Sequence, residues 1–264
     1  MANVVGRAAI PGGAGIQTRL FWHRAVVLEL IQETPHVKSL VLDVPGWTGH
    51  RAGQHLDVRL TAADGYQAER SYSIASAPGD ANVTITVERL DDGEVSPYLT
   101  DELRVGDELE LRGPIGGWFT WRPEDGEGGP LLLVAGGSGI APLRAMIRQR
   151  AAVQSPVPVC LLYSSRAYEE IIYRGELDGR AAEEMDLRVV YTLTRAQPLG
   201  WQGYARRIDR PMLEEVAWAP EEHPLIFICG PTPLVESVAT TCVELGYAPE
   251  RIKTERFGPT GGET

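Results

Sequence analysis

The sequence LLLVAGGSGIAPLRAMI, residues 131–147, decides the fold of the second half of this 264-residue chain. The five apolar residues 131–135 indicate a buried strand, and a helical pattern begins at Ile140 or Ala141, directly after the glycines. Glycine lets the backbone approach a ligand closely, and the free N–H groups of a helix start bind anions. Pro142 suits the first helical turn, where a missing N–H costs nothing. The stretch therefore predicts a strand–turn–helix unit that holds a phosphate group.

This turn departs from the dinucleotide fingerprint G-x-G-x-x-G, because Pro142 stands at the position of the third glycine. A common Rossmann dehydrogenase is therefore disfavoured. Beyond the turn, apolar strands alternate with helical stretches, which predicts a parallel five-stranded sheet with helices on both faces. The strands that can be bounded are residues 131–135, 157–163, 187–192 and 225–229, and the helices are residues 141–152, 169–184, 211–216 and 234–245.

The first half of the chain has a different pattern. Residues 21–122 consist of short runs rich in β-branched residues, separated by turn signals. One helical segment, residues 96–103, interrupts them, with Ser96 as its expected N-cap and Pro97 in its first turn. Six short strands with one helix predict an antiparallel six-stranded β-barrel. The expected organisation is a flexible tail over residues 1–20, the barrel over 21–122, a linker over 123–130 and an α/β domain over 131–264.

Six segments in fixed order carry a family resemblance. They are RSYSIAS from Arg70, DGEVSPYLTDEL from Asp92, GGSGIAP from Gly136, YSSR from Tyr163, TRAQPLGWQG from Thr194 and CGPTP from Cys229. Together they resemble the ferredoxin–NADP reductase superfamily over residues 21–258. Within it, the chain is most similar to the reductase components of oxygenases without their iron–sulfur domain. The resemblance implies a flavin-binding barrel followed by an NAD(P)-binding domain.

The resemblance assigns the flavin to the barrel. It implies that Arg70 contacts the flavin phosphate, that Tyr72 lies against the flavin and that Ser73 hydrogen-bonds its N5 edge. These roles suit a guanidinium, a flat ring with a polar tip and a small hydroxyl. FAD, whose second phosphate and adenine need further protein surface, is preferred over FMN. A glycine turn, free N–H groups and a hydroxyl before the helix form a second expected phosphate site, which consists of Gly93, Glu94, Val95 and Ser96.

The nicotinamide nucleotide is assigned to the α/β domain. The expected pyrophosphate ligands are the turn glycines Gly136, Gly137 and Gly139. A hydroxyl and an arginine after the second strand indicate selection of the 2′-phosphate of NADPH, while NADH remains possible. The residues concerned are Ser164, Ser165 and Arg166, with Arg195 as a weaker neighbouring candidate.

Cys229 and Phe257 complete the expected reaction site. A cysteine in an apolar strand is usually a packing residue. The resemblance implies instead that Cys229, directly before Gly230 and Pro231, borders the nicotinamide as a positioning group. Phe257 matches the family's C-terminal aromatic residue that covers the flavin, although the chain runs seven residues beyond it. Ser73 and Cys229 are thus the expected catalytic residues.

Composition and charge disfavour several other classes of protein. A net charge of −11 argues against a nucleic-acid partner. Three cysteines cannot supply the four thiolates of a plant-type 2Fe–2S cluster, and no spacing of ligands suggests a metal site. No apolar stretch is long enough to span a bilayer, and the N-terminus does not resemble a signal peptide. A cytoplasmic protein is therefore expected.

The sequence thus predicts a flavin-dependent NAD(P)H reductase. Hydride would pass from NAD(P)H to FAD, and electrons would then pass to a separate redox protein, such as a ferredoxin, a haem protein or an oxygenase component. One alternative keeps the fold and changes the acceptor to free flavin, quinone or another small molecule. A less favoured alternative is a nucleotide-binding subunit without turnover.

Overall fold

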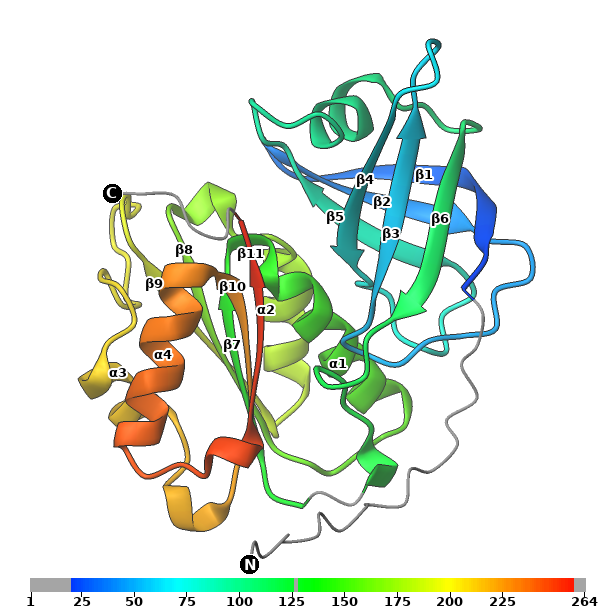
Figure 1. Ribbon diagram of the computed structural model, residues 1–264. Coiled ribbons are helices and arrows are strands. Elements are labelled where there is room, and N and C mark those ends of the chain that lie inside the picture. The colour runs from blue at the N-terminus through cyan, green and yellow to red at the C-terminus, as the bar shows by residue number, and fades with distance from the viewer. Residues whose placement is uncertain (1–19, 126–127, 259–264) are drawn as a thin grey trace, which may run out of the picture.

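The computed structural model describes residues 20–125 and 128–258, which form two domains packed against each other (Figure 1). The tail expected at residues 1–20 lies outside the described residues except for Leu20. Phe119 and Trp121, which follow the last barrel strand, are buried in the same apolar cluster as the parallel sheet. The two domains therefore share part of a core.

The N-terminal domain is an antiparallel barrel, as predicted. Ile74 pairs with Ile85, and the Ala75 N–H donates to the carbonyl of Thr84 at 2.8 Å, so the two edge strands of the sheet meet. Closure removes the exposed edges that an open sheet would present. The six strands are β1 Trp22–Thr34, β2 Val37–Asp43, β3 His55–Thr61, β4 Gln67–Ser73, β5 Val83–Glu88 and β6 Glu108–Ile115, in the order β4-β3-β6-β1-β2-β5.

The helix of this domain includes a short π-helical segment, η1 (Tyr98–Glu102). The prediction that Ser96 caps this helix is wrong. Its buried hydroxyl accepts a hydrogen bond from the Leu90 N–H at 3.0 Å, and no side chain caps the helix start. The turn that leads into the helix folds back on itself, which brings a backbone donor to the hydroxyl.

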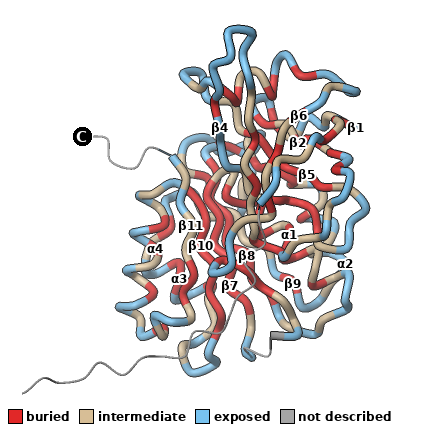
Figure 2. The backbone as a smooth tube through the Cα atoms, turned by 45° about the vertical axis from the view of Figure 1, so that its right-hand side comes forward, coloured by how far each residue is buried: buried red, intermediate tan, exposed pale blue. Residues whose placement is uncertain are grey.

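The C-terminal domain contains the predicted parallel five-stranded sheet. Its three central strands, which are β7, β8 and β10, are buried along almost their whole length, and Figure 2 shows them in red. The strands are β7 Leu131–Gly136, β8 Val159–Ser165, β9 Leu187–Leu193, β10 Leu225–Pro231 and β11 Ile252–Phe257, in the order β11-β10-β7-β8-β9. The helices are α1 Ile140–Ala152, α2 Arg174–Glu183, α3 Arg210–Val216 and α4 Thr232–Glu244.

Alternate residues along each strand face the two helical layers. Leu133 and Phe227 lie in the apolar cluster that contains α1 and α2, on the side of the barrel. Val134 and Ile228 lie in the cluster that contains α3 and α4. Burial of both faces explains why these strands are continuous apolar runs.

The helix predicted at residues 169–184 begins only at Arg174. Tyr173 has a φ of 60°, in the left-handed region, so the helix cannot extend through it. The ring of Tyr173 is buried between the domains, where its hydroxyl hydrogen-bonds Thr86 of β5 and the Arg144 guanidinium lies 4.1 Å from its ring centre. This contact between domains outweighs the local preference for helix. In the described part of the chain, no helix is both long and apolar enough to cross a membrane.

Candidate flavin and nucleotide site

The two segments predicted to bind the flavin meet on the barrel. Arg70 of β4 donates from Nη2 to Oε2 of Glu94, in the turn before the helix, at 2.7 Å. The Tyr66 hydroxyl donates to the other Glu94 oxygen at 3.0 Å. Both charged side chains are about half exposed. The guanidinium therefore remains accessible to a phosphate, which fits the donor set that a flavin nucleotide needs.

Val95 and Ser96, from the same predicted segment, are buried in the barrel. Their side chains point away from solvent, and the Ser96 hydroxyl is already bonded to Leu90. Val95 can therefore reach a ligand only through its backbone. The Ser96 oxygen accepts the bond from Leu90, so its O–H proton is still available as a donor, and the predicted contact of this hydroxyl with a phosphate stays a prediction.

Tyr72 and Ser73 end strand β4 at the side of the second domain. Tyr72 packs against the barrel core, and burial raises its pKa to about 12, so the phenol stays protonated at neutral pH. Ser73 pairs in register with His55 of β3. Because side chains alternate along a strand, Tyr72 and Ser73 present opposite faces.

Two cross-strand register pairs and one side-chain contact relate the positions of Ser73 and Cys229 across the domain boundary. His55, the cross-strand neighbour of Ser73, has its Nδ1 atom 3.9 Å from Oε1 of Glu255 in β11. Glu255 in turn pairs in register with Cys229 of β10. The two predicted catalytic residues thus lie on either side of one boundary, with His55 and Glu255 between them.

Glu255 is a largely buried carboxylate, with a side chain that is about a quarter exposed. Its Oε2 atom is buried and has no hydrogen-bond partner, and burial raises its pKa to about 7. Burial and the neighbouring Glu255 both raise the pKa of Cys229 well above its ordinary value. Cys229 is therefore a neutral thiol at physiological pH, which suits a positioning role and not that of a nucleophile.

A pocket of about 730 Å³ lies between the two domains at the carboxyl ends of the parallel strands. The barrel contributes Glu88 and Arg89, which lie at the end of β5. The position follows the rule that ligands bind beyond the carboxyl ends of parallel strands. Eight of the residues predicted for cofactor binding line it: Gly136, Gly137, Ser164, Ser165, Arg166, Arg195, Pro231 and Phe257.

The glycine turn between β7 and α1 is fixed by its neighbours. A Cβ atom on Gly139 would lie 2.3 Å from the carbonyl oxygen of Cys229, so no larger residue fits. Gly137 has a φ of 53°, and its carbonyl accepts a hydrogen bond from the Tyr163 hydroxyl at 3.0 Å. Ser138 stands between these glycines and contributes a hydroxyl at the same place. The turn fits a pyrophosphate, because it combines close backbone approach with the start of a 13-residue helix.

Besides Arg89 of the barrel, three arginines of the α/β domain line the same pocket. Arg166 and Arg195 are neighbours, because the Arg195 N–H donates to the Arg166 carbonyl at 2.9 Å. Arg207 also lines the pocket. Its neighbour Arg206 is instead paired with Asp209 at 2.8 Å. Ser165 is buried and donates to the Ala167 carbonyl at 3.2 Å, so its hydroxyl already has a partner within the loop.

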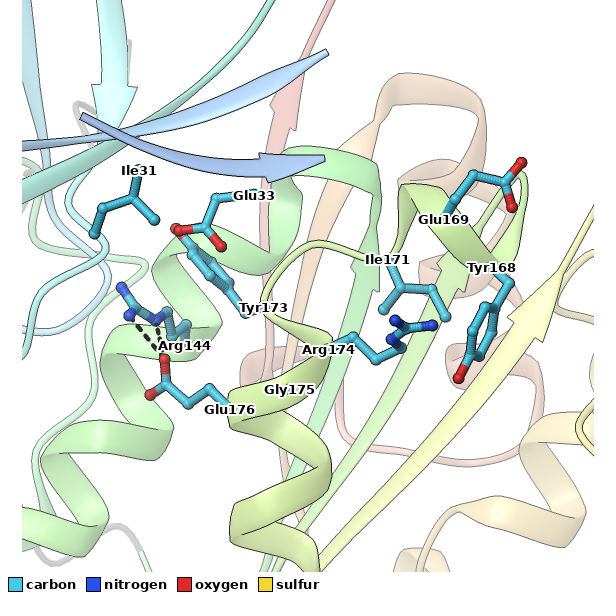
Figure 3. A pocket seen from close by; sticks show the side chains of 10 residues that line it. All are labelled: Ile31, Glu33, Arg144, Tyr168, Glu169, Ile171, Tyr173, Arg174, Gly175 and Glu176. Atoms are coloured by element: carbon cyan, nitrogen blue, oxygen red, sulfur yellow. Dashed lines mark hydrogen bonds and ion pairs between the residues drawn. The ribbon is translucent and has the colours of Figure 1, made fainter. Parts of the chain in front are cut away.

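A second, smaller pocket of about 370 Å³ lies between β1 and the start of α2 (Figure 3). Arg144 and Glu176 from two helices point toward each other there and pair at 2.7 Å. The Arg174 guanidinium lies 3.8 Å from the ring centre of Tyr168. None of the residues predicted for cofactor binding lines this pocket, so it is part of the contact between the domains.

His55 and Arg207 are candidate residues that the sequence did not place in the site, whereas Glu255 lies two residues before the predicted Phe257. His55 is not singled out in the sequence, because no spacing of ligands around it suggests a metal site. Their position depends on strand register and on how the domains pack. Neither leaves a signal in local sequence.

Comparison with known proteins agrees with this geometry. Residues 26–120 match the family described as oxidoreductase FAD-binding domain, and residues 133–240 match the family described as oxidoreductase NAD-binding domain. The chain is 32% identical to the glycine betaine monooxygenase reductase subunit of Pseudomonas aeruginosa over 91% of its own length and 66% of that protein. It is 35% identical to ferredoxin–NADP reductase B of Sorangium cellulosum, over 78% of this chain and 84% of that protein.

A solved structure shows the same arrangement of two domains. The FAD/NAD-binding domain of the nitric oxide dioxygenase from Vibrio cholerae superposes with a TM-score of 0.79 at 25% identity, covering 90% of this chain and 99% of that one. The chain spans just under two thirds of the length of the glycine betaine monooxygenase reductase subunits that it matches. It belongs to the ferredoxin–NADP reductase family of FAD- and NAD-binding oxidoreductases.

Proposed function

We propose that this chain is an FAD-dependent NAD(P)H reductase that delivers electrons to a separate redox protein. The observation that carries the proposal is the meeting of two domains at one boundary, where Nδ1 of His55 lies 3.9 Å from Oε1 of Glu255 and where the neighbouring strands bear the predicted residues Ser73 and Cys229. When bound, the flavin accepts a hydride and releases electrons singly, which is the chemistry that the protein itself cannot supply.

The protein's contribution is to bind and orient both cofactors. Arg70 and the backbone of residues 93–96 hold the flavin phosphates, while Tyr72 supports the ring and the Ser73 hydroxyl donates to its N5 edge. The glycine turn holds the nucleotide pyrophosphate. Cys229, a buried neutral thiol at the end of β10, is the proposed positioning residue for the nicotinamide, and Phe257 lines the interdomain pocket.

NADPH is the proposed nucleotide. A 2′-phosphate carries nearly two negative charges, and Arg166, Arg195 and Arg207 surround the pocket with positive charge. Glu170 lines the same pocket and favours a ribose hydroxyl over a phosphate, so NADH is the competitor to be tested.

The proposed acceptor is an oxygenase component, a ferredoxin or a haem protein. The curated relatives include a monooxygenase reductase subunit and a ferredoxin–NADP reductase, both named for such electron transfer. The proposed compartment is the cytoplasm, where thiols stay reduced, and this chain has three free buried cysteines: Cys160, Cys229 and Cys242.

An absorbance spectrum of the purified protein, followed by anaerobic stopped-flow mixing with NADPH or NADH, tests the proposal. Bound flavin that is bleached by the nucleotide supports it, and a protein without flavin under reconstitution with FAD contradicts it. Cys229→Ser should slow flavin reduction by roughly ten- to a hundredfold while NADP⁺ affinity changes little, because the thiol orients the nicotinamide. Unchanged reduction would return Cys229 to a packing role.

The acceptor is tested by steady-state turnover. A reductase for protein partners should be accelerated by a ferredoxin or oxygenase component. If oxidation of NADPH instead saturates with free flavin at low concentration while protein acceptors give no gain, the enzyme is a small-molecule reductase.

A further inference from the structure

A carboxylate from the barrel lies against the phosphate-binding turn of the other domain. Glu88 is the last residue of β5 and lines the interdomain pocket. Its Oε2 atom accepts a hydrogen bond from the Ser138 hydroxyl at 2.7 Å. The same oxygen would lie 3.8 Å from a Cβ atom built on Gly137. An anionic group therefore occupies the position where a pyrophosphate is expected to bind.

The backbone on both sides of the contact between Glu88 and Ser138 is held in place by its neighbours. The backbone of Glu88 is held in the sheet by its pairing with Val37, and the Arg89 N–H donates to the His36 carbonyl at 2.8 Å. On the other domain, Gly139 lies directly against the backbone of Cys229. The side chain of Glu88 is thus the element that must reorient when a ligand enters.

The Glu88 carboxylate has no cation to neutralise it within the described part of the chain. Among the described residues it accepts the hydrogen bond from Ser138, and its negative charge helps to raise the pKa of the buried Tyr163 hydroxyl, but no ion pair of Glu88 is found. The adjacent Arg89 is paired with Asp101 at 2.8 Å and with Asp91. The negative charge therefore remains directed at the turn, whose first helical N–H groups favour anions.

We propose that Glu88 is an internal competitor for the phosphate-binding turn, which weakens dinucleotide binding and so tunes the affinity of the site. This inference rests on the proposed function, since it concerns the same nucleotide pocket. An incoming pyrophosphate must displace the carboxylate from Ser138 and then lies near a like charge, which opposes binding. The dinucleotide is consequently held less tightly than the turn alone would allow, and the oxidised product leaves more readily.

The opposite role is physically possible and gives the opposite result. A carboxylate can also accept hydrogen bonds from ribose hydroxyls, in which case Glu88 would be a ligand of the nucleotide. Glu88→Gln separates the two roles, because the amide keeps the shape and the acceptor for Ser138 but removes the charge. Glu88→Ala removes both.

The test is calorimetric titration of the FAD-loaded enzyme with NADP⁺ and with NAD⁺, and with 2′-AMP as a fragment without a pyrophosphate. We expect Glu88→Gln and Glu88→Ala to bind the preferred dinucleotide about tenfold more tightly than the wild type, with 2′-AMP unchanged. Asp91→Asn is the matched control, since it removes a carboxylate that lines the same pocket and is paired with Arg89. Its dinucleotide affinity should stay within about twofold of the wild type, because an exposed charge is screened by salt.

Dinucleotide binding by both Glu88 variants that is equal to or weaker than that of the wild type would overturn the inference. It would also be overturned if the Glu88 variants gained as much affinity for 2′-AMP as for the dinucleotide, or if Asp91→Asn gained as much affinity for the dinucleotide as they do. Either gain would mean a general effect of charge. If the wild type binds the dinucleotide and Glu88→Gln binds it no more tightly, this inference fails while the proposed function stands. If the wild type and the variants bind neither dinucleotide, the proposed function fails and this inference fails with it.

Discussion

The flavin half and the nucleotide half of the site are built by different means. On the barrel, Arg70 and Glu94 meet through a half-exposed pair of flexible side chains. In the α/β domain, Gly139 lies against the backbone of Cys229 with no space for a side chain. Flexible side chains can exchange one partner for another at low cost, whereas close backbone packing tolerates no change. Substitutions in the two halves should therefore fail in different ways.

The largest effect is expected in the nucleotide half, where close backbone packing forms the site. Gly139→Ala should destabilise the protein by about 3 kcal/mol and abolish nucleotide binding, because its Cβ atom would lie 2.3 Å from the carbonyl oxygen of Cys229. Denaturant unfolding and titration with NADP⁺ measure both effects. Gly179→Ala is the control, since Gly179 is helical and has open space around it. It should be more stable by roughly 0.5–1 kcal/mol. Similar stability of the two variants would contradict the idea that close packing fixes the turn.

In the flavin half, where flexible side chains form the site, a substitution should weaken ligand binding and leave the stability of the fold almost unchanged. Arg70→Ala should weaken FAD binding by roughly 1.5–3 kcal/mol, or about ten- to a hundredfold, since a charge-assisted contact is lost. Its free energy of unfolding without flavin should change by less than about 1 kcal/mol, as for other exposed ion pairs. The flavin content after dialysis measures the first effect, and Arg24→Ala, another exposed arginine of the barrel paired with Glu108, is the control. Full retention of flavin by Arg70→Ala would remove Arg70 from the phosphate site.

Between the two halves, Glu255 should make stability depend on pH. Its folded pKa of about 7 lies above the ordinary value of 4.5, so the folded state binds the proton more tightly than the unfolded state does. The contribution of Glu255 to the free energy of unfolding is fully present below about pH 4.5 and is lost as the pH rises to about 7. The loss should be roughly 1–2 kcal/mol for a side chain that is a quarter exposed.

Denaturant unfolding at several pH values between 5 and 8 measures this dependence. Glu255→Gln should lose the decline in stability between pH 5 and 7 while keeping the other titrations of the protein. A parallel pH profile for the variant and the wild type would show that Glu255 titrates normally.

The smallest effect is expected at the exposed end of the nucleotide pocket. Arg166→Ala should raise the KM for NADPH by about fivefold, near 1 kcal/mol, and leave NADH almost unchanged, because an exposed arginine is partly screened. Steady-state kinetics with both nucleotides measure this, with Arg210→Ala as the control, since Arg210 pairs with Glu244 on a neighbouring helix. An equal loss with both nucleotides, or a wild type that prefers NADH, would end the proposal of NADPH.

Some features could be predicted from sequence because they depend on neighbouring residues. The turn after residues 131–135 and the apolar runs of the sheet are local patterns, and both are confirmed. The start of α2 could not be predicted, because Tyr173 takes a left-handed conformation to place its ring against the barrel. The N-cap role predicted for Ser96 is wrong for a related reason, because its hydroxyl accepts a hydrogen bond from the backbone N–H of Leu90 in the preceding turn.

The sequence by itself determined that there are two domains, how strands and helices follow one another along the chain, and which segments bear the candidate cofactor residues. These follow from periodicity, turn chemistry and family motifs, all of which are written in short stretches of chain. Only the tertiary structure decided that His55 contacts Glu255 and that Glu88 reaches Ser138. Both contacts join residues from different domains, and their geometry is set by strand register and domain packing, which no local pattern encodes.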